Sequence, residues 1–325
     1  MKVLNIGLIG ASRVAVYAVI APAREMAGVH VSGVAARDPD RAAAYADTHD
    51  LDRAYADYDA LIADPAINLV YVGLPPRDHA EVALRAIRAG KAVLVEKPFA
   101  MTADEARAVF AAARQAGLPV FEAMHSLHHR LFARILEIIA GGELGDIRHL
   151  DAEFSVRIAD DDYRWRPGLG GGALMDLGVY PLAWVRRIAG EDFRVVEAMA
   201  DMRQGVDAAF SARLAFPGGP SAAVRGSMQA EARRIALTVE GSLGRMIVTN
   251  PMVPQLGHEL ELLTENGSRC ETVDGPGTYD AQLAAVRATV IEGTQFPLPA
   301  DDYVNSMAAI DRIRAVFASP GTAAA

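Results

Sequence analysis

Residues Gly7–Ala15 read GLIGASRVA, directly after a short apolar run and at the start of a segment with helical spacing. Small residues occupy the three places of a dinucleotide-binding turn, with Gly10 at the first, Ser12 at the second and Ala15 at the third. Small side chains there let the backbone turn tightly, approach a pyrophosphate and pack the helix against the strand. The free N–H groups of the helix start attract phosphate. The stretch predicts a nucleotide-binding turn, and a plain tight turn is the alternative.

Short apolar runs alternate with helical segments from Lys2 to about Val120. Because each helix returns the chain to the start of the next strand, this order requires parallel pairing. The expected strands are Val3–Ile9, Val29–Ala35, Leu69–Val72, Ala92–Val95 and Pro119–Phe121, and the expected helices are Val14–Met26, Asp40–His49, His79–Ala89 and Thr102–Gln115. The fold class is therefore α/β, with an N-terminal doubly wound parallel sheet of the Rossmann type over residues 1–121.

The rhythm changes over residues 122–325, where strands follow one another and hairpin-like breaks occur at residues 216–220 and 241–244. The expected strands are Arg194–Met202, Ala208–Phe216, Ser221–Gln229, Ile235–Glu240 and Arg245–Val248, and the expected helices are Leu131–Ile139, Ala173–Ile188, Tyr279–Glu292 and Asp301–Phe317. This part predicts an α+β domain with a large open, mostly antiparallel sheet. A chain of 325 residues is long enough for two such domains.

The composition narrows the partners and the compartment. Apolar residues make up 51% of the chain and the net charge is -9, with no local basic cluster. A folded protein with this charge is not expected to bind nucleic acid or an anionic membrane. The single cysteine, Cys270, forms no intrachain disulfide, and neither a signal-peptide pattern nor a bilayer-length apolar run is present. We expect a cytoplasmic location.

The end of the second strand predicts the cofactor. An acidic residue there would bind the ribose 2'-hydroxyl of NAD, but this chain has Ala36 and Arg37 at that place, and Asp38 is placed to cap the next helix. A guanidinium suits a 2'-phosphate by charge and by bidentate geometry. Arg37 therefore predicts NADP in preference to NAD, and a solvated surface arginine is the alternative.

Several motifs occur in a fixed order. Glu96-Lys97-Pro98 ends a very apolar strand at the carboxyl edge where ligands of open parallel sheets bind, and residues 170–180 read GGGALMDLGVY. Together with the GLIGA start, they resemble the Gfo/Idh/MocA family of glucose-fructose oxidoreductase, inositol dehydrogenase and rhizopine-catabolism proteins. Gly73-Leu74-Pro75 with His79 extends the likeness. The chain is most similar to the branch of dimeric dihydrodiol dehydrogenase, glucose-fructose oxidoreductase and NADP-dependent xylose dehydrogenases.

This resemblance implies an active site between a Rossmann domain and an open-sheet domain. Lys97 would lie beside the nicotinamide ribose and the substrate hydroxyl, and Asp176 and Tyr180 would face the same cleft as the remaining catalytic residues. Tyr180 would serve as the general acid and base, because a neighbouring ammonium favours the phenolate. The alternative is a core tyrosine bonded to Asp176. The cofactor-binding residues would be Gly7, Gly10, Ala11, Ser12, Arg13, Val14, Ala36, Arg37, Leu74, Pro75, His79, Glu96, Lys97 and a cis Pro98.

Three histidines, His125, His128 and His129, have the spacing of metal ligands. No cysteine or carboxylate partner accompanies them, so we expect no metal. The resemblance instead places this segment over the substrate pocket. His125 is therefore a candidate substrate-binding residue, as are Arg164 and Trp165 from the segment before the glycine motif.

The resulting hypothesis is a reversible hydride transfer between NADP and a carbinol carbon of a sugar, a cyclic polyol or a dihydrodiol. One alternative is a non-enzymatic dinucleotide-binding regulator, which would have no need of Lys97, Asp176 and Tyr180. Another is a glycosidase that recycles NAD on the same fold. An open sheet with helices on one side leaves its other face to a partner, so we expect a homodimer or homotetramer.

Overall fold

The computed structural model describes residues 2–317, which form two compact units. Within the described residues, the first unit contains residues 2–124 and 279–307, and the second contains residues 125–278 and 308–317. Residues 279–307 group with the first unit because Leu283 and Val286 are buried in its hydrophobic core. The sequence analysis divides the chain once, between residues 121 and 122. A single division of this kind cannot assign residues 279–307 to the first unit.

The first unit contains a six-stranded parallel sheet within the described residues, with the order β3-β2-β1-β4-β5-β6. The order reverses at β1, which confirms the predicted doubly wound sheet. The strands are β1 Leu4–Ile9, β2 Val29–Ala35, β3 Arg53–Tyr55, β4 Leu69–Val72, β5 Ala92–Val95 and β6 Val120–Glu122. The short β3 is not predicted from the sequence. Every residue of β4 and β5 is buried, as expected for strands covered on both faces.

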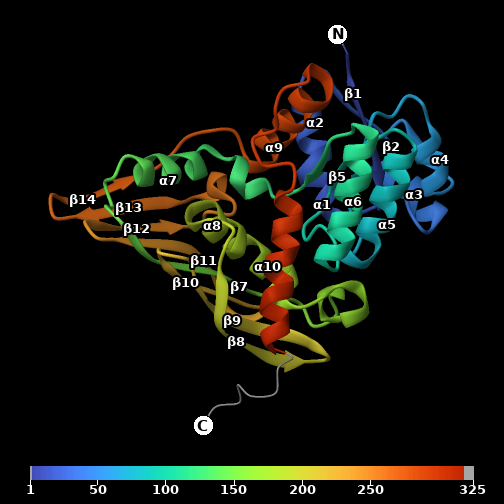
Figure 1. Cartoon of the computed structure of the whole chain (residues 1–325). Coiled ribbons are helices and arrows are strands. Elements are labelled where there is room, and N and C mark those ends of the chain that lie inside the picture. Colours follow the sequence, from blue (N-terminus) through green and yellow to red (C-terminus); the bar gives the residue numbers. More distant parts are fainter. Residues whose placement is uncertain (1, 318–325) are drawn as a thin grey trace. The chain divides into compact units, whose positions relative to one another are not determined.

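The helices of this unit follow their predicted positions closely. The predicted helix Val14–Met26 consists of α1, a π-helical segment η1 and α2, and α4 is an additional short helix. The helices are α1 Arg13–Ala15, η1 Val16–Ile20, α2 Ala21–Glu25, α3 Pro39–Thr48, α4 Tyr58–Ala63, α5 His79–Arg88, α6 Ala103–Ala116, α9 Thr278–Arg287 and η8 Ala288–Glu292, with a 3-10 turn η2 at Pro76–Asp78. Figure 1 shows the helices α3, α4, α5 and α6 of this unit around its strands. The last helix, α10 Asp302–Phe317, begins in the first unit and ends in the second.

The second unit contains an eight-stranded sheet within the described residues, with the order β14-β13-β12-β11-β7-β10-β9-β8. Among the strands of the described residues, only β7 and β10 pair in parallel, which confirms the predicted open, mostly antiparallel sheet. The strands are β7 Ile147–Arg157, β8 Arg194–Arg203, β9 Val206–Ala215, β10 Ser221–Ser227, β11 Gln229–Gly241, β12 Gly244–Thr249, β13 Glu259–Thr264 and β14 Gly267–Glu271. The sequence prediction lacks β7, β13 and β14.

One face of this sheet is buried and the other is half-exposed. Ala152 and Phe154 of β7 and Val224 of β10 are buried, while the residues between them are intermediate. Helix α8 (Val179–Ala189) packs on β7 and β10, and α7 spans Arg130–Ala140. Short turns precede these helices or lie in loops: η3 His125–His128, η4 Tyr163–Trp165, η5 Pro167–Leu169, η6 Leu174–Gly178 and η7 Pro254–Leu256.

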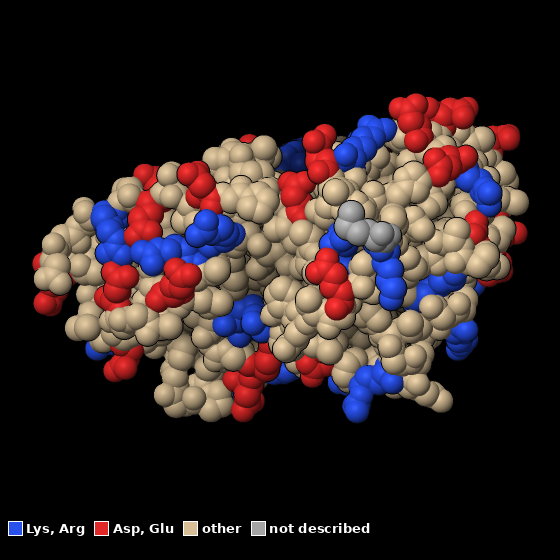
Figure 2. All heavy atoms as spheres, turned by 90° about the horizontal axis from the view of Figure 1, so that it is seen from above, with Lys and Arg blue, Asp and Glu red and all other residues tan. Residues whose placement is uncertain are grey.

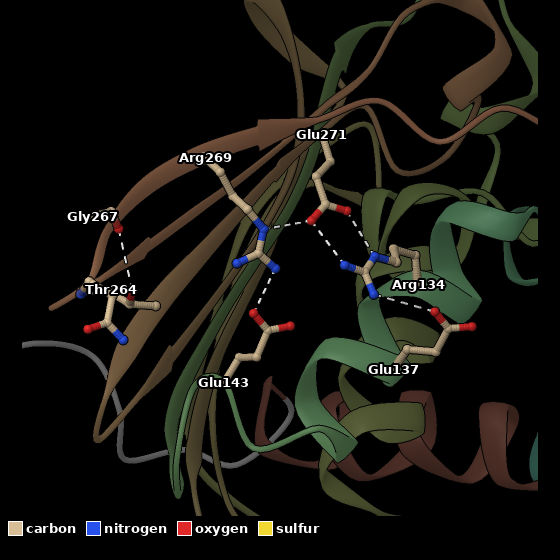
Figure 3. A network of polar contacts seen from close by, with 8 residues as sticks. Arg134, Glu137, Glu143, Thr264, Gly267, Arg269 and Glu271 are labelled. Carbon is tan, nitrogen blue, oxygen red and sulfur yellow. Dashed lines mark hydrogen bonds and ion pairs between the residues drawn. The ribbon is translucent and has the colours of Figure 1, made fainter.

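An ion-pair network joins the edge strand β14 to α7 (Figure 3). Arg134 Nε lies 2.8 Å from Glu271 Oε2, and Arg269 Nε lies 2.8 Å from the other oxygen of the same carboxylate. Arg269 also pairs with Glu143 at 2.7 Å. The hydrogen bonds from the two arginines lower the pKa of Glu271 to about 2.

Figure 2 shows acidic and basic side chains interspersed over the face that it draws. None of the described helices is long and apolar enough to cross a membrane.

Candidate active site

The turn after β1 has the geometry of a phosphate-binding loop. Gly10 has φ +102, and its N–H donates to Ala35 O at 2.8 Å. A Cβ at Gly10 would lie 2.6 Å from Gly73 O, so both the positive φ and the close approach of two backbones require glycine here. Ser12 caps the helix that follows, because its Oγ accepts from Ala15 N at 3.3 Å. This tight turn onto a helix start fits the pyrophosphate of a dinucleotide.

Two side chains of α3 brace this turn from outside. Arg41 donates to Ala11 O at 2.8 Å, and the Tyr45 hydroxyl donates to Ser12 O at 2.9 Å. Sequence reasoning missed both residues, although their i,i+4 spacing on the helix after Arg37 was a usable signal. Burial raises the pKa of Tyr45 to about 12, and the nearby Arg41 opposes this rise. The phenol therefore stays a hydrogen-bond donor at neutral pH.

The other residues predicted from this turn differ in their surroundings. Gly7 lies within β1, where a Cβ would come within 2.6 Å of Leu61 and Ile67, so its small size serves packing. Arg13 is exposed and Val14 is half-buried at the start of α1. Their contact with a cofactor, like that of Gly7, stays a prediction.

The end of β2 presents Arg37 to solvent. Ala36 is buried, whereas the Arg37 side chain is 78% exposed and its guanidinium lies 4.0 Å from Asp78 Oδ2. Asp38 caps α3 by accepting from Asp40 N at 3.0 Å, as predicted. A phosphate could therefore approach the exposed guanidinium of Arg37. The guanidinium of Arg41 donates to the backbone of the turn at Ala11.

His79 ties two loops of the parallel sheet together. Its ring nitrogens lie 2.9 Å from Pro98 O and 2.7 Å from Leu74 O, and the residue is fully buried. Burial lowers the pKa of His79, and the two carbonyls oppose this effect. His79 therefore positions the loops that carry the half-exposed Leu74, Pro75 and Lys97, rather than presenting a free ring nitrogen.

The loop after β5 is fixed on both sides of Lys97. The Tyr71 hydroxyl donates to Glu96 Oε1 at 2.8 Å in the interior, and Phe99 N donates to Glu122 Oε1 at 2.9 Å. The Lys97–Pro98 peptide bond is cis, which confirms that prediction. Glu122 is a further residue that sequence reasoning missed. Lys97 itself is half-exposed between these anchors.

In the second unit, a carboxylate holds the glycine motif in place. Gly172 has φ +116, and a Cβ there would lie 2.1 Å from Asp207 Oδ1. Asp207 of β9 accepts from Leu174 N at 2.6 Å, at the start of the π-helical turn η6. Asp207 lies on a strand remote in sequence and was not predicted. It fixes the start of the segment that carries Asp176 and Tyr180.

Asp176 is paired with one of the candidate substrate-binding residues. Arg164 Nε lies 2.7 Å from Asp176 Oδ2, and its NH1 lies 3.1 Å from Asp162 Oδ1. Trp165 is buried, and its Nε1 donates to Ala159 O at 2.9 Å. In this arrangement Arg164 holds the loop and Asp176, and Trp165 anchors the loop. Substrate contact by either residue stays a prediction.

Tyr180 is buried among aromatic side chains at the start of α8. The ring centroids of Phe154 and Trp184 lie 5.4 Å and 6.4 Å from its own. Its hydroxyl lies 3.0 Å from His125 Nε2, and His125 Nδ1 lies 2.9 Å from Thr278 Oγ1. The phenol thus has an imidazole partner that sequence reasoning did not assign to it.

The neighbouring histidines have separate surroundings. His129 Nδ1 accepts from Leu131 N at 3.0 Å and so caps α7, and burial lowers the pKa of His128 to about 4. Among the described residues, no group of three or more His, Cys, Asp or Glu side chains is arranged to hold a metal ion.

A doubly wound sheet with this turn defines the class of dinucleotide-binding Rossmann domains, and here an open sheet follows it. Residues 4–124 match the oxidoreductase family with the NAD-binding Rossmann fold, and residues 132–247 match the Gfo/Idh/MocA C-terminal domain. The chain belongs to the Gfo/Idh/MocA family, as the motif resemblance predicts.

Three relatives illustrate the range of the family. The chain is 33% identical to D-xylose 1-dehydrogenase (NADP(+)) 2 of Haloferax volcanii over 98% of both chains. It is 30% identical to trans-1,2-dihydrobenzene-1,2-diol dehydrogenase of Macaca fascicularis, over 86% of this chain and 85% of the relative. A 3-ketoreductase of Actinomadura kijaniata, solved with NADP and TDP-benzene, has a TM-score of 0.90 at 25% identity, over 97% of this chain and 98% of the ketoreductase.

Proposed function

We propose that the protein catalyses a reversible, NADP-dependent oxidation of a carbinol group in a sugar, cyclic polyol or dihydrodiol. The nicotinamide, when bound, supplies the hydride acceptor or donor. Tyr180 receives the hydroxyl proton in the oxidation direction and returns it in the reduction. The observation that carries the proposal is a buried phenol with a hydrogen-bonded imidazole, 3.0 Å from its oxygen, in a member of an oxidoreductase family.

The substrate class follows the relatives whose names state what they act on. These are a xylose dehydrogenase, a dihydrodiol dehydrogenase and reductases of dTDP-linked deoxysugars. Each of these names gives a dehydrogenase or a reductase and a sugar or diol compound. The common chemistry, rather than any one of these substrates, is what we carry over.

The choice of NADP rests on Arg37. Its side chain is exposed at the end of β2, and no acidic side chain occupies the place that would bind a ribose 2'-hydroxyl. A guanidinium favours the 2'-phosphate electrostatically and geometrically. The xylose dehydrogenase and the ketoreductase named above are both associated with NADP.

Lys97 and Asp176 complete the proposed machinery. The Lys97 ammonium orients the substrate hydroxyl. Asp176, paired with Arg164, fixes the geometry of the helix start that carries Tyr180. The anchors on Glu96 and Glu122 support the position of Lys97.

The test is Tyr180→Phe on a substrate found by screening aldoses, polyols and diols for NADPH formation. Phenylalanine retains the ring packing and removes the ionisable oxygen, so kcat should fall by about 10² to 10⁴ while the KM for NADP stays the same. Tyr163→Phe, a half-exposed tyrosine in the same unit, is the matched control and should retain activity. An unchanged kcat in Tyr180→Phe would exclude the proposed acid-base role.

A further inference from the structure

A chain of polar side chains leads away from Tyr180 through the interior of the second unit. The Tyr180 hydroxyl lies 3.0 Å from His125 Nε2, and the opposite ring nitrogen lies 2.9 Å from Thr278 Oγ1. The exposed fractions of Tyr180, His125 and Thr278 are 4%, 1% and 0%. Both nitrogens of a fully buried imidazole are therefore used in side-chain hydrogen bonds.

The chain continues to a side chain at the surface. Gln255 Nε2 donates to Thr278 Oγ1 at 3.3 Å, and Thr278 N donates to Gln255 Oε1 at 3.4 Å. Gln255 belongs to the short turn η7 and is exposed. A hydroxyl oxygen has two lone pairs, so Thr278 can accept from Gln255 and from His125 at the same time. The imidazole is thereby held in one orientation by a partner that is itself fixed.

The hydrogen bonds of His125 suit it to accept a proton from the Tyr180 hydroxyl. When His125 Nδ1–H donates to Thr278, the lone pair of Nε2 faces the Tyr180 hydroxyl and accepts its hydrogen bond. An imidazole that carries one N–H has a lone pair on its second nitrogen, and this lone pair can bind a further proton. The aromatic rings of Phe154 and Trp184 pack against the phenol and leave its oxygen directed at the imidazole.

We propose that His125 is the immediate proton partner of Tyr180, with Thr278 as the residue that positions the imidazole. This inference rests on the proposed function. In the oxidation direction, the substrate O–H bond breaks and its proton binds Tyr180 Oη. At the same time the former Oη–H bond breaks and that proton binds His125 Nε2. The electron pair of the substrate O–H bond forms the carbonyl, as the carbinol C–H bond breaks and its electron pair leaves as hydride to the oxidised nicotinamide, the hydride acceptor of the proposed function. Reduction reverses each transfer.

Four substitutions test this role by kcat. His125→Phe removes both hydrogen bonds, and His125→Gln retains a polar group that cannot accept a proton. Thr278→Val removes the support of the imidazole, and Thr278→Ser retains it. We expect losses of kcat of about 10- to 100-fold in His125→Phe, His125→Gln and Thr278→Val, and near-normal kcat in Thr278→Ser, with an unchanged KM for NADP throughout.

The control is a second histidine with the same kind of partner. His149 Nδ1 lies 2.7 Å from Ser221 Oγ on the exposed side of the large sheet. His149→Gln should leave kcat unchanged. Full activity in His125→Gln would overturn the proton-accepting role, because an amide would then be sufficient at this place.

A second measurement requires neither cofactor nor turnover, and it remains informative if His125→Phe does not fold. In ¹⁵N-labelled protein, the imidazole nitrogens of one histidine among eight should shift when Tyr180 is replaced by Phe, and the same signals should be missing in His125→Gln. If no histidine signal responds to Tyr180→Phe, the hydrogen bond is absent and the proposal is rejected.

The two proposals fail in distinguishable ways. An unchanged kcat in Tyr180→Phe removes the acid-base role of Tyr180, and the role of His125 with it. A large loss in Tyr180→Phe together with full activity in His125→Gln removes only the role of His125.

Discussion

Asp207 of β9 accepts a 2.6 Å hydrogen bond from the backbone N–H of Leu174, where the segment that carries Asp176 and Tyr180 begins. The carboxylate lies so close to Gly172 that any side chain there would meet it. A strand of the sheet therefore sets the starting point of the segment that carries Asp176 and Tyr180. Burial raises the pKa of Asp207 to about 6, and the bond to Leu174 opposes that rise.

The raised pKa of Asp207 predicts a pH-dependent contribution to stability. Between pH 4 and 6 the native state binds this proton more readily than the unfolded chain does, so the contribution of Asp207 to the unfolding free energy falls as the pH rises through this window. Asp207→Asn keeps an acceptor but removes the titration. Between pH 4 and 6, the unfolding free energy of the parent, measured by urea unfolding, should fall by up to about 2 kcal/mol more than that of the variant. The exposed Asp192→Asn is the control, and an identical pH slope in parent and Asp207→Asn would contradict the prediction.

The pair of Arg164 and Asp176 predicts energetic coupling. Arg164→Met leaves the buried Asp176 carboxylate without this cation and should cost about 2 to 4 kcal/mol of unfolding free energy. Asp176→Asn in the same chain should recover at least about 1 kcal/mol, because the amide carries no charge to be compensated. Urea unfolding of the two single variants and the double variant measures this coupling. Strictly additive effects would show that the pair contributes nothing specific.

Cofactor choice should follow Arg37. Arg37→Ala should raise the KM for NADP at least about tenfold and change the KM for NAD little, because only NADP carries the 2'-phosphate. Arg107→Ala, an exposed arginine on α6, is the matched control and should change neither. Equal effects of Arg37→Ala on both cofactors would refute the assignment.

Association is expected through the half-exposed face of the large sheet. Ala223 and Arg225 lie on this face of β10, where Arg225 pairs with Asp151 at 2.7 Å and with Glu153 at 2.9 Å. These ion pairs neutralise the charge of Arg225, and neighbouring side chains such as that of Ala223 are small. A second copy of the sheet could therefore pack against this face. Ala223→Arg should convert the oligomer to monomer in sedimentation velocity, and the exposed Ala116→Arg should not. A parent chain that is monomeric at micromolar concentration would rule out this association.

Local signals in the sequence were sufficient for most of the fold. The GLIGASRVA turn, the buried runs of β4 and β5 and the breaks at residues 216–220 and 241–244 each depend on residues near one another in the chain. The strands that escaped prediction are either short, as β3 is, or an exposed edge with few apolar residues, as β14 is. Strands β7 and β13 are exceptions, since Leu150, Ala152 and Phe154 alternate in β7 and Leu260 and Leu262 alternate in β13.

The sequence by itself determined the fold class, the nucleotide-binding turn and the candidates Lys97, Asp176 and Tyr180, because the motifs that carry them are contiguous. Only the tertiary structure decided what holds Asp176 and Tyr180 in the second unit. Tyr180 and His125 are 55 residues apart, and His125 and Thr278 are 153 apart. Hydrogen bonds at such separations depend on how distant segments pack, and a histidine beside two other histidines carries no local sign of which hydroxyl it will meet.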